Sequence, residues 1–191
     1  IKLDGWEFVG GMFDDMEPVQ SDGLPQRFRL ARGDLCDCIF EFVIPILIDD
    51  RNQSVSAELM VQCELGQLNE RGGIDREEFR VSLDYGAQKY ISSGKSGCME
   101  DELLEIQKQL PEHIFLKACI NCLYSDYSPF GSGAFGRMMC FRNLKQEYLQ
   151  VKSKEDFFHV HDRFERQVQE TWLCDEFERR VPNTGYRGYR G

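Results

Sequence analysis

The chain has 191 residues, a formal net charge of −10 and a hydrophobic content of 41%. This length can bury a core without disulfide bonds, and 29% charged residues beside 14 Phe and 7 Tyr predict a packed fold rather than a disordered chain. The negative charge repels a phosphate backbone, so nucleic-acid binding over most of the surface is not expected.

The sequence does not predict a membrane partner. The most apolar run, residues 38–48, falls short of the roughly 20 residues that a spanning helix needs and is interrupted by Glu41 and Pro45. The opening IKLDGWEFVG has no signal-peptide pattern, although a missing start methionine leaves a trimmed terminus open. We therefore expect a cytoplasmic protein. In that compartment, metal ligation or burial is favoured over disulfide formation as the role of the eight cysteines.

The first half of the chain has the period of β-strands. Apolar and polar residues alternate over residues 58–65 and 78–85, which predicts an antiparallel sheet with one wet face. Residues 39–48 are apolar at nearly every position, as in a strand that is covered on both faces and lies deepest. Pro45 predicts an edge position or a bulge in that strand.

Helical spacing begins in the second half. Residues 100–110 predict an amphipathic helix with an acidic first turn that ends at Pro111, and residues 113–118 predict a strand. A longer helix is predicted from an N-cap at Ser153, with Asp156 three residues on, to Cys174.

These patterns predict an α+β fold. Residues 1–97 are expected to form a β-rich, β-sandwich-like antiparallel layer. Residues 98–191 are expected to form a helical, cysteine-bearing α/β region that packs with the first region as one unit. Strand order and oligomeric state do not follow from these patterns.

Four cysteines are candidate zinc ligands. Cys119 and Cys122 are two residues apart, so that both sulfurs can face one ion from a tight turn, as in a zinc knuckle. Cys140 and Cys174 would complete a tetrahedral structural site. Small buried thiols are the competing interpretation, and a redox CxxC is a further one.

The remaining metal-binding residue types fit a site less well. His159 and His161 are two apart and would face different sides of the predicted helix, whereas His113 could replace a cysteine ligand. The other four cysteines have no partner at ligand spacing and are interpreted as structural or inert: Cys36, Cys38, Cys63 and Cys98.

Two further segments could carry a function. The loop at residues 125–136 combines hydroxyl groups with glycines, which is typical of a pocket lining and also of a structural loop. From Arg179 onward there are four arginines and no acid, which indicates a solvated tail or a nucleic-acid-binding arm. No motif for nucleophilic or acid–base catalysis is recognisable.

Two stretches, CINCLYSDYSPFGSGAFGRMMCFRNLK and VQETWLCDEFERRVPNTGYRG, resemble an uncharacterised bacterial family, a domain of unknown function of similar length. The four candidate zinc ligands lie inside these stretches, so the resemblance implies that Cys119, Cys122, Cys140 and Cys174 act together. It implies no activity.

The sequence therefore favours a zinc-stabilised protein-binding protein. The acidic body predicts a basic protein partner, as for an adaptor or an immunity protein that neutralises a cationic toxin. The alternative is a metal-dependent or thiol-dependent hydrolase, in which a zinc ion with an open ligand position or a surface cysteine would act on an unknown substrate.

Overall fold

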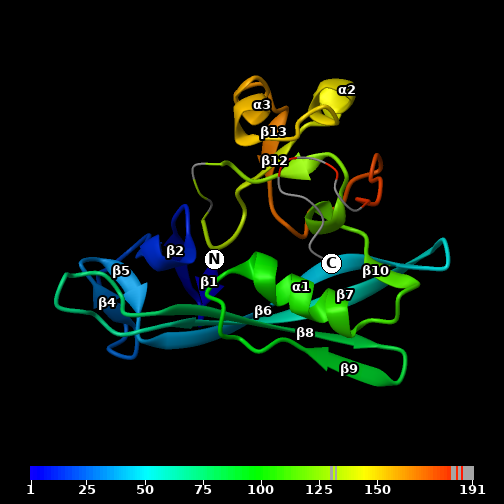
Figure 1. Cartoon of the computed structure of the whole chain (residues 1–191). Helices are drawn as coiled ribbons and strands as arrows, with labels where there is room; N and C mark the ends of the chain where they lie inside the picture. The colour runs from blue at the N-terminus through cyan, green and yellow to red at the C-terminus, as the bar shows by residue number, and fades with distance from the viewer. Residues whose placement is uncertain (130, 132, 182–183, 185, 187–191) are drawn as a thin grey trace.

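The computed structural model describes residues 1–129, 131, 133–181, 184 and 186. Its centre is a five-stranded antiparallel sheet in the order β10-β6-β7-β8-β9, and α1 lies on one face of this sheet (Figure 1). The bounds are β6 (Cys38–Asp50), β7 (Gln53–Leu65), β8 (Glu77–Tyr85), β9 (Gln88–Ile91), β10 (Ile114–Leu116) and α1 (Met99–Gln109).

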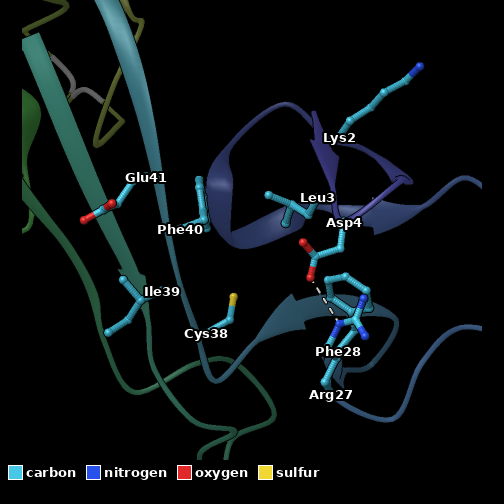
Figure 2. Close-up of a pocket in the computed structure, with 9 residues that line it drawn as sticks. All are labelled: Lys2, Leu3, Asp4, Arg27, Phe28, Cys38, Ile39, Phe40 and Glu41. Carbon is cyan, nitrogen blue, oxygen red and sulfur yellow. Dashed lines mark ion pairs between the residues drawn. The ribbon is translucent and has the colours of Figure 1, made fainter.

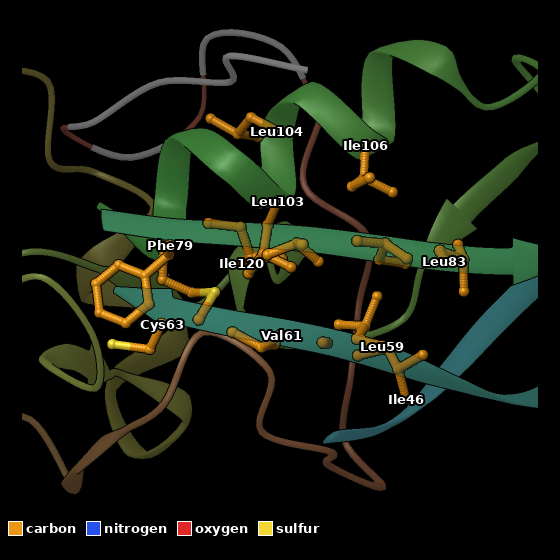
Figure 3. Close-up of a cluster of buried hydrophobic side chains, with 14 of the residues drawn as sticks. Ile46, Leu59, Val61, Cys63, Phe79, Leu83, Leu103, Leu104, Ile106 and Ile120 are labelled. Atoms are coloured by element: carbon orange, nitrogen blue, oxygen red, sulfur yellow. The ribbon is translucent and has the colours of Figure 1, made fainter. Parts of the chain in front are cut away.

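The alternating strands form the middle of the sheet, as predicted. Val61 of β7 pairs with Phe42 of β6 and with Val81 of β8, and Val61 and Val81 are fully buried. Leu103 and Ile106 of α1 pack over this face (Figure 3), and Ile106 is also fully buried. Each such aliphatic side chain contributes about 1.5–3 kcal/mol through burial.

The prediction that β6 is covered on both faces was wrong. Ile46 is buried beneath α1 and its neighbours, whereas Ile39 and Val43 are 59% and 46% exposed. The described elements cover only the α1 side of the sheet, so the opposite side of β6 faces solvent (Figure 1). The edge position of Pro45 is confirmed, because β10 pairs with β6 only at Ile48–Asp50 and β6 is the sheet edge at Pro45.

The second layer is not a second large sheet, so the sandwich-like expectation needs correction. Short pieces at one end of the sheet and α1 together form this layer, since α1 supplies the apolar stripe that the sheet face needs. The antiparallel, mixed α and β character is as predicted. The short pieces are β1 (Lys2–Leu3), β2 (Trp6–Val9), η1 (Phe13–Asp15), β3 (Glu17–Pro18), β4 (Arg29–Ala31) and β5 (Asp34–Cys36).

The C-terminal half contains short elements above the sheet (Figure 1). They are η2 (Cys119–Asn121), β11 (Ser125–Asp126), β12 (Met138–Cys140), η3 (Arg142–Leu144), α2 (Lys145–Tyr148), α3 (Lys154–Phe158) and β13 (Arg166–Val168). They enclose a second core, in which the ring of Phe141 stacks on that of Tyr148 with 4.8 Å between centroids.

The long helix predicted from Ser153 to Cys174 was wrong beyond its first turns. Ser153 does cap the helix and forms a capping box with Asp156, but α3 ends at Phe158. Further on, Val168 pairs with Met138 in the sheet of β12 and β13, so strand pairing overrides the helical spacing. None of the helices in the described ranges is long and apolar enough to cross a membrane.

Candidate metal centre

The CxxC segment forms a tight turn directly after β10. The main-chain N–H of Cys122 donates to the carbonyl of Cys119 at 3.1 Å, and both side chains are buried. The N–H of Cys119 donates to the carbonyl of Trp172 at 3.1 Å. The turn is therefore held against the segment that carries Cys174.

Cys140 and Cys174 approach from two other elements. Cys140 ends β12, between Ser125 of β11 and Arg166 of β13. Cys174 lies in a turn that is closed by a hydrogen bond from the N–H of Phe177 to the carbonyl of Cys174 at 3.2 Å. Its side chain is only partly buried.

The four thiols share one neighbourhood. Burial raises the pKa of Cys119, and the charges of Cys122, Cys140 and Cys174 raise it further, which places all three within electrostatic range of its sulfur. No three His, Cys, Asp or Glu side chains in the described part of the chain are arranged to hold a metal ion. The fold thus brings Cys122, Cys140 and Cys174 within electrostatic range of Cys119, and a zinc site on these four residues stays a prediction.

Hydrogen-bond donors are directed at these sulfurs. Burial raises the pKa of Cys122, while main-chain N–H groups of Tyr124 and Glu178 act in the opposite direction by donating to its sulfur. The N–H of Arg142 does the same for Cys140, and the Arg142 guanidinium lies 3.9 Å from the sulfur of Cys174. Hydrogen bonds of this kind favour the thiolate, which is the form that binds zinc.

A buried polar network behind the CxxC turn was not anticipated. Arg180 is 2% exposed and donates to the carbonyl of Cys122 at 3.1 Å, to the carbonyl of Ser125 and to the hydroxyl of Tyr148 at 2.9 Å. The Tyr148 hydroxyl in turn donates to Asp126 at 2.8 Å. No local pattern distinguishes Arg180 from its neighbours, so only the tertiary fold identifies it.

The loop that begins at Ser125 starts as part of the core. The Ser125 hydroxyl donates to the carbonyls of Cys119 and Cys122, which fixes the turn. The Tyr127 hydroxyl donates to the buried Glu170 at 2.8 Å. The hydroxyl groups at the start of this loop therefore support the cysteine turn and the segment packed against it. Positions 130 and 132 of the loop lie outside the described residues.

The basic tail is only partly described. Arg179 lies over the ring of Phe115, 4.2 Å from its centroid, and Arg180 is buried in the polar network. These two arginines have structural contacts, which a solvated tail does not explain. Arg187 and Arg190 lie outside the described residues.

The histidines lie elsewhere. His113 is 3.6 Å from Asp50 at the far end of β6, where it forms an exposed pair. Nδ1 of His161 lies 3.0 Å from the carbonyl of Phe158, just after α3. His161 is therefore on a turn rather than on the predicted helix stripe.

The cysteines of the first half are separate from the cluster. Cys63 is fully buried among the sheet residues, and Cys98 precedes α1. Cys38 lines a hollow of about 450 Å³ beside Phe40, close to the ion pair of Arg27 with Asp4 (Figure 2). Burial, Cys36 and Asp37 raise the pKa of Cys38 to about 11, so this thiol lacks the activation that a nucleophile needs.

Comparison with known proteins matches residues 1–125 to a family of unknown function, DUF6304. The matched region includes Cys119 and Cys122 and ends before Cys140 and Cys174. No curated protein matches the chain. No solved structure matches it. Because the match spans most of the sequence, the chain belongs to the DUF6304 family of unknown function.

Proposed function

We propose that this chain is a zinc-stabilised protein-binding protein of the cytoplasm, in which zinc on Cys119, Cys122, Cys140 and Cys174 stabilises the C-terminal half. The observation that carries the zinc proposal is the gathering of four thiols from separate elements, with main-chain donors directed at Cys122 and Cys140. Four thiolates would close the tetrahedral shell, so the ion would have a structural role.

The donor set fits zinc in its chemistry. Thiolate sulfur is the ligand that structural zinc sites use most, and such a site is assembled only as the chain folds. Here η2, β12 and the turn at Cys174 supply the ligands, so one ion would tie together segments up to 55 positions apart, from Cys119 to Cys174.

The partner in this proposal is a basic protein, in an adaptor or immunity role. The net charge of −10 supports it, because an acidic surface accelerates encounters with cationic partners and repels acidic ones. Binding should weaken as salt is raised from about 0.05 to about 0.5 M, because added ions screen the attraction between surface charges over this range. Salt-independent binding to its physiological partner would contradict this part of the proposal.

The thiol-hydrolase alternative is less well supported. Burial raises the pKa of Cys119, Cys122 and Cys140, and the same is true of Cys38 beside its hollow. A reactive cysteine needs a lowered pKa and access to solvent. The metal-dependent alternative requires an open ligand position, which a shell of four thiolates does not leave.

The zinc proposal is tested with Cys122→Ser. We expect about one zinc per chain in the untagged wild-type protein by elemental analysis, and loss of that zinc in the variant. The free energy of unfolding should be lower by at least about 3 kcal/mol in the variant, which corresponds to a fall in melting temperature of about 10 °C.

Cys98→Ser is the matched control, since Cys98 is half-buried and lies outside the cluster. It should retain both zinc and stability. If the wild-type protein contains no metal and Cys122→Ser does not change the melting temperature, the zinc proposal is wrong and the four cysteines are buried thiols.

A further inference from the structure

The sheet face opposite α1, here called the outer face, carries an apolar row that no described element covers. Val43 pairs with Met60, Met60 with Ser82, and Ser82 with Ile91, so the row crosses four strands. The exposed fractions are 46% for Val43, 42% for Met60 and 48% for Ile91. With strands about 4.8 Å apart, the row is roughly 14 Å long, which is room for several side chains of a partner.

A hollow in this row has carboxylates at its rim. It measures about 250 Å³ and is lined by Val43, Glu58, Met60, Ser82 and Asp84. Within the described ranges, no cation lies within ion-pair distance of Glu58, and Asp84 has only an exposed lysine, Lys89, at 3.7 Å. An exposed pair of this kind contributes little and is readily exchanged.

Carboxylates outnumber cations on the outer face. Strand alternation directs four more carboxylates to it. The cations on this side are Arg80 and Lys89 of the strands, Arg76, which is paired with Glu64, and Lys117, which donates to Ser54. The apolar floor of the hollow and its acidic rim together fit a side chain that has an aliphatic stem and a cationic head. The additional carboxylates are Glu41, Asp49, Glu64 and Glu78.

We propose that the outer face is the docking surface for a basic protein, and that an arginine of this partner enters the hollow. The aliphatic stem covers Val43 and Met60, and the guanidinium lies between Glu58 and Asp84, where its planar fork can donate to both carboxylates. This inference rests on the proposed binding of a basic partner and adds the surface and the anchoring residue.

A second copy of the chain is a poorer occupant. Two outer faces brought together would place Glu58 and Asp84 of each copy near the same carboxylates of the other, without a matching excess of cations. Like charges at close range oppose such a dimer. Charge complementarity thus favours a basic partner over self-association.

The test uses the 191-residue chain as purified and a blocked seven-residue peptide of alternating arginine and leucine. Binding is measured by fluorescence anisotropy at low salt, and the contact is mapped by amide chemical shifts. Glu58→Gln combined with Asp84→Asn should weaken binding roughly tenfold, and Met60→Lys should weaken it at least as much. The shifted amides should lie in β6, β7 and β8.

The matched control is Asp22→Asn combined with Glu112→Gln, which changes the net charge equally at exposed sites away from the outer face. It should leave binding within about twofold of wild type. Equal weakening by both double variants, or shifts confined to other elements, would overturn the docking surface while the basic-partner proposal stands.

Two other outcomes concern different proposals. A wild-type protein that contains zinc but does not bind the peptide at low salt would overturn both the docking surface and the basic partner, and would leave the zinc site intact. Sedimentation that shows a dimer abolished by Met60→Lys would assign the outer face to a second copy and overturn the inference.

Discussion

Two charged side chains differ in how their buried polar atoms are satisfied. Arg180, one residue before the end of the continuously described chain at Val181, fills the space behind the CxxC turn and donates to the carbonyls of Cys122 and Ser125. Glu77 is the contrasting case, because its Oε1 atom is buried without a hydrogen-bond partner. The Arg180 guanidinium is hydrogen-bonded to several acceptors, whereas the unpartnered Glu77 oxygen is a local source of instability.

Glu77 gives the stability a pH dependence. Burial, together with the charges of Asp14 and Asp15, raises the pKa of Glu77 from 4.5 to about 7. The folded state therefore holds a proton that the unfolded state has released between these pH values, so the contribution of Glu77 to stability is greatest below pH 4.5 and is lost as pH rises through about 7. We expect Glu77→Gln to stabilise the protein by about 2 kcal/mol at pH 8 and by little at pH 4.5, as measured by urea unfolding.

The control for this residue is Glu78→Gln, the next position on β8, whose side chain faces the outer side of the sheet. It should change stability by less than about 0.5 kcal/mol at both pH values. A Glu77→Gln protein with the same pH profile as wild type would show that Glu77 is ionised at no cost.

Among the elements, α1 is the one that joins the sheet to the cysteine turn. Gln107 of α1 is buried, donates to the carbonyl of Ile114 at 3.0 Å, and accepts from the N–H of Leu116 at 2.9 Å and from the Asn121 side chain at 3.0 Å. Asn121 itself lies between Cys119 and Cys122. A single amide side chain therefore positions β10 and η2 on the helix.

Removal of this amide should be costly. Gln107→Ala leaves the buried N–H of Leu116 without a partner and removes one of the two acceptors of the Asn121 amide, which keeps the carbonyl of Leu116. An unsatisfied buried group costs about 1–3 kcal/mol. We expect the free energy of unfolding to fall by about 2–4 kcal/mol, measured by urea unfolding. Lys108→Ala, on the exposed side of α1, should have an effect below about 0.5 kcal/mol, and equal effects would contradict the bridging role.

The whole molecule contains two principal cores that differ in size and support. The larger core extends from the N-terminal strands through α1 to Ile120, and the smaller one is built around Phe141, Tyr148 and Phe157. The smaller core consists of short elements, which have little stability of their own. It is the part that a zinc ion would stabilise most.

Removal of zinc should therefore act unevenly. We expect a chelator to reduce the amide hydrogen-exchange protection of residues 119–180 by at least about tenfold while β7 and β8 keep most of theirs. The Cys122→Ser protein should show the same pattern without chelator. Uniform loss of protection across both cores would mean that the metal stabilises the chain globally, and no loss would contradict a structural metal.

The sequence by itself determined the local features. Strict alternation over residues 58–65 and 78–85 specified β7 and β8, the acidic turn and Pro111 bounded α1, and Ser153 with Asp156 specified a helix start. Each of these depends on the period of a regular element or on a capping interaction between neighbours, so the information is present within a few residues.

Only the tertiary structure decided the rest. The apolar run of β6 does not reveal that one side, with Ile39 and Val43, is left without a covering layer, because that depends on where other elements pack. The spacing around Val168 fits a helix and a strand equally, and its pairing with Met138 selected the strand. Cysteine spacing suggested a common site, but the gathering of Cys140 and Cys174 around the CxxC turn, and the burial of Arg180 behind it, required contacts between segments far apart in the chain.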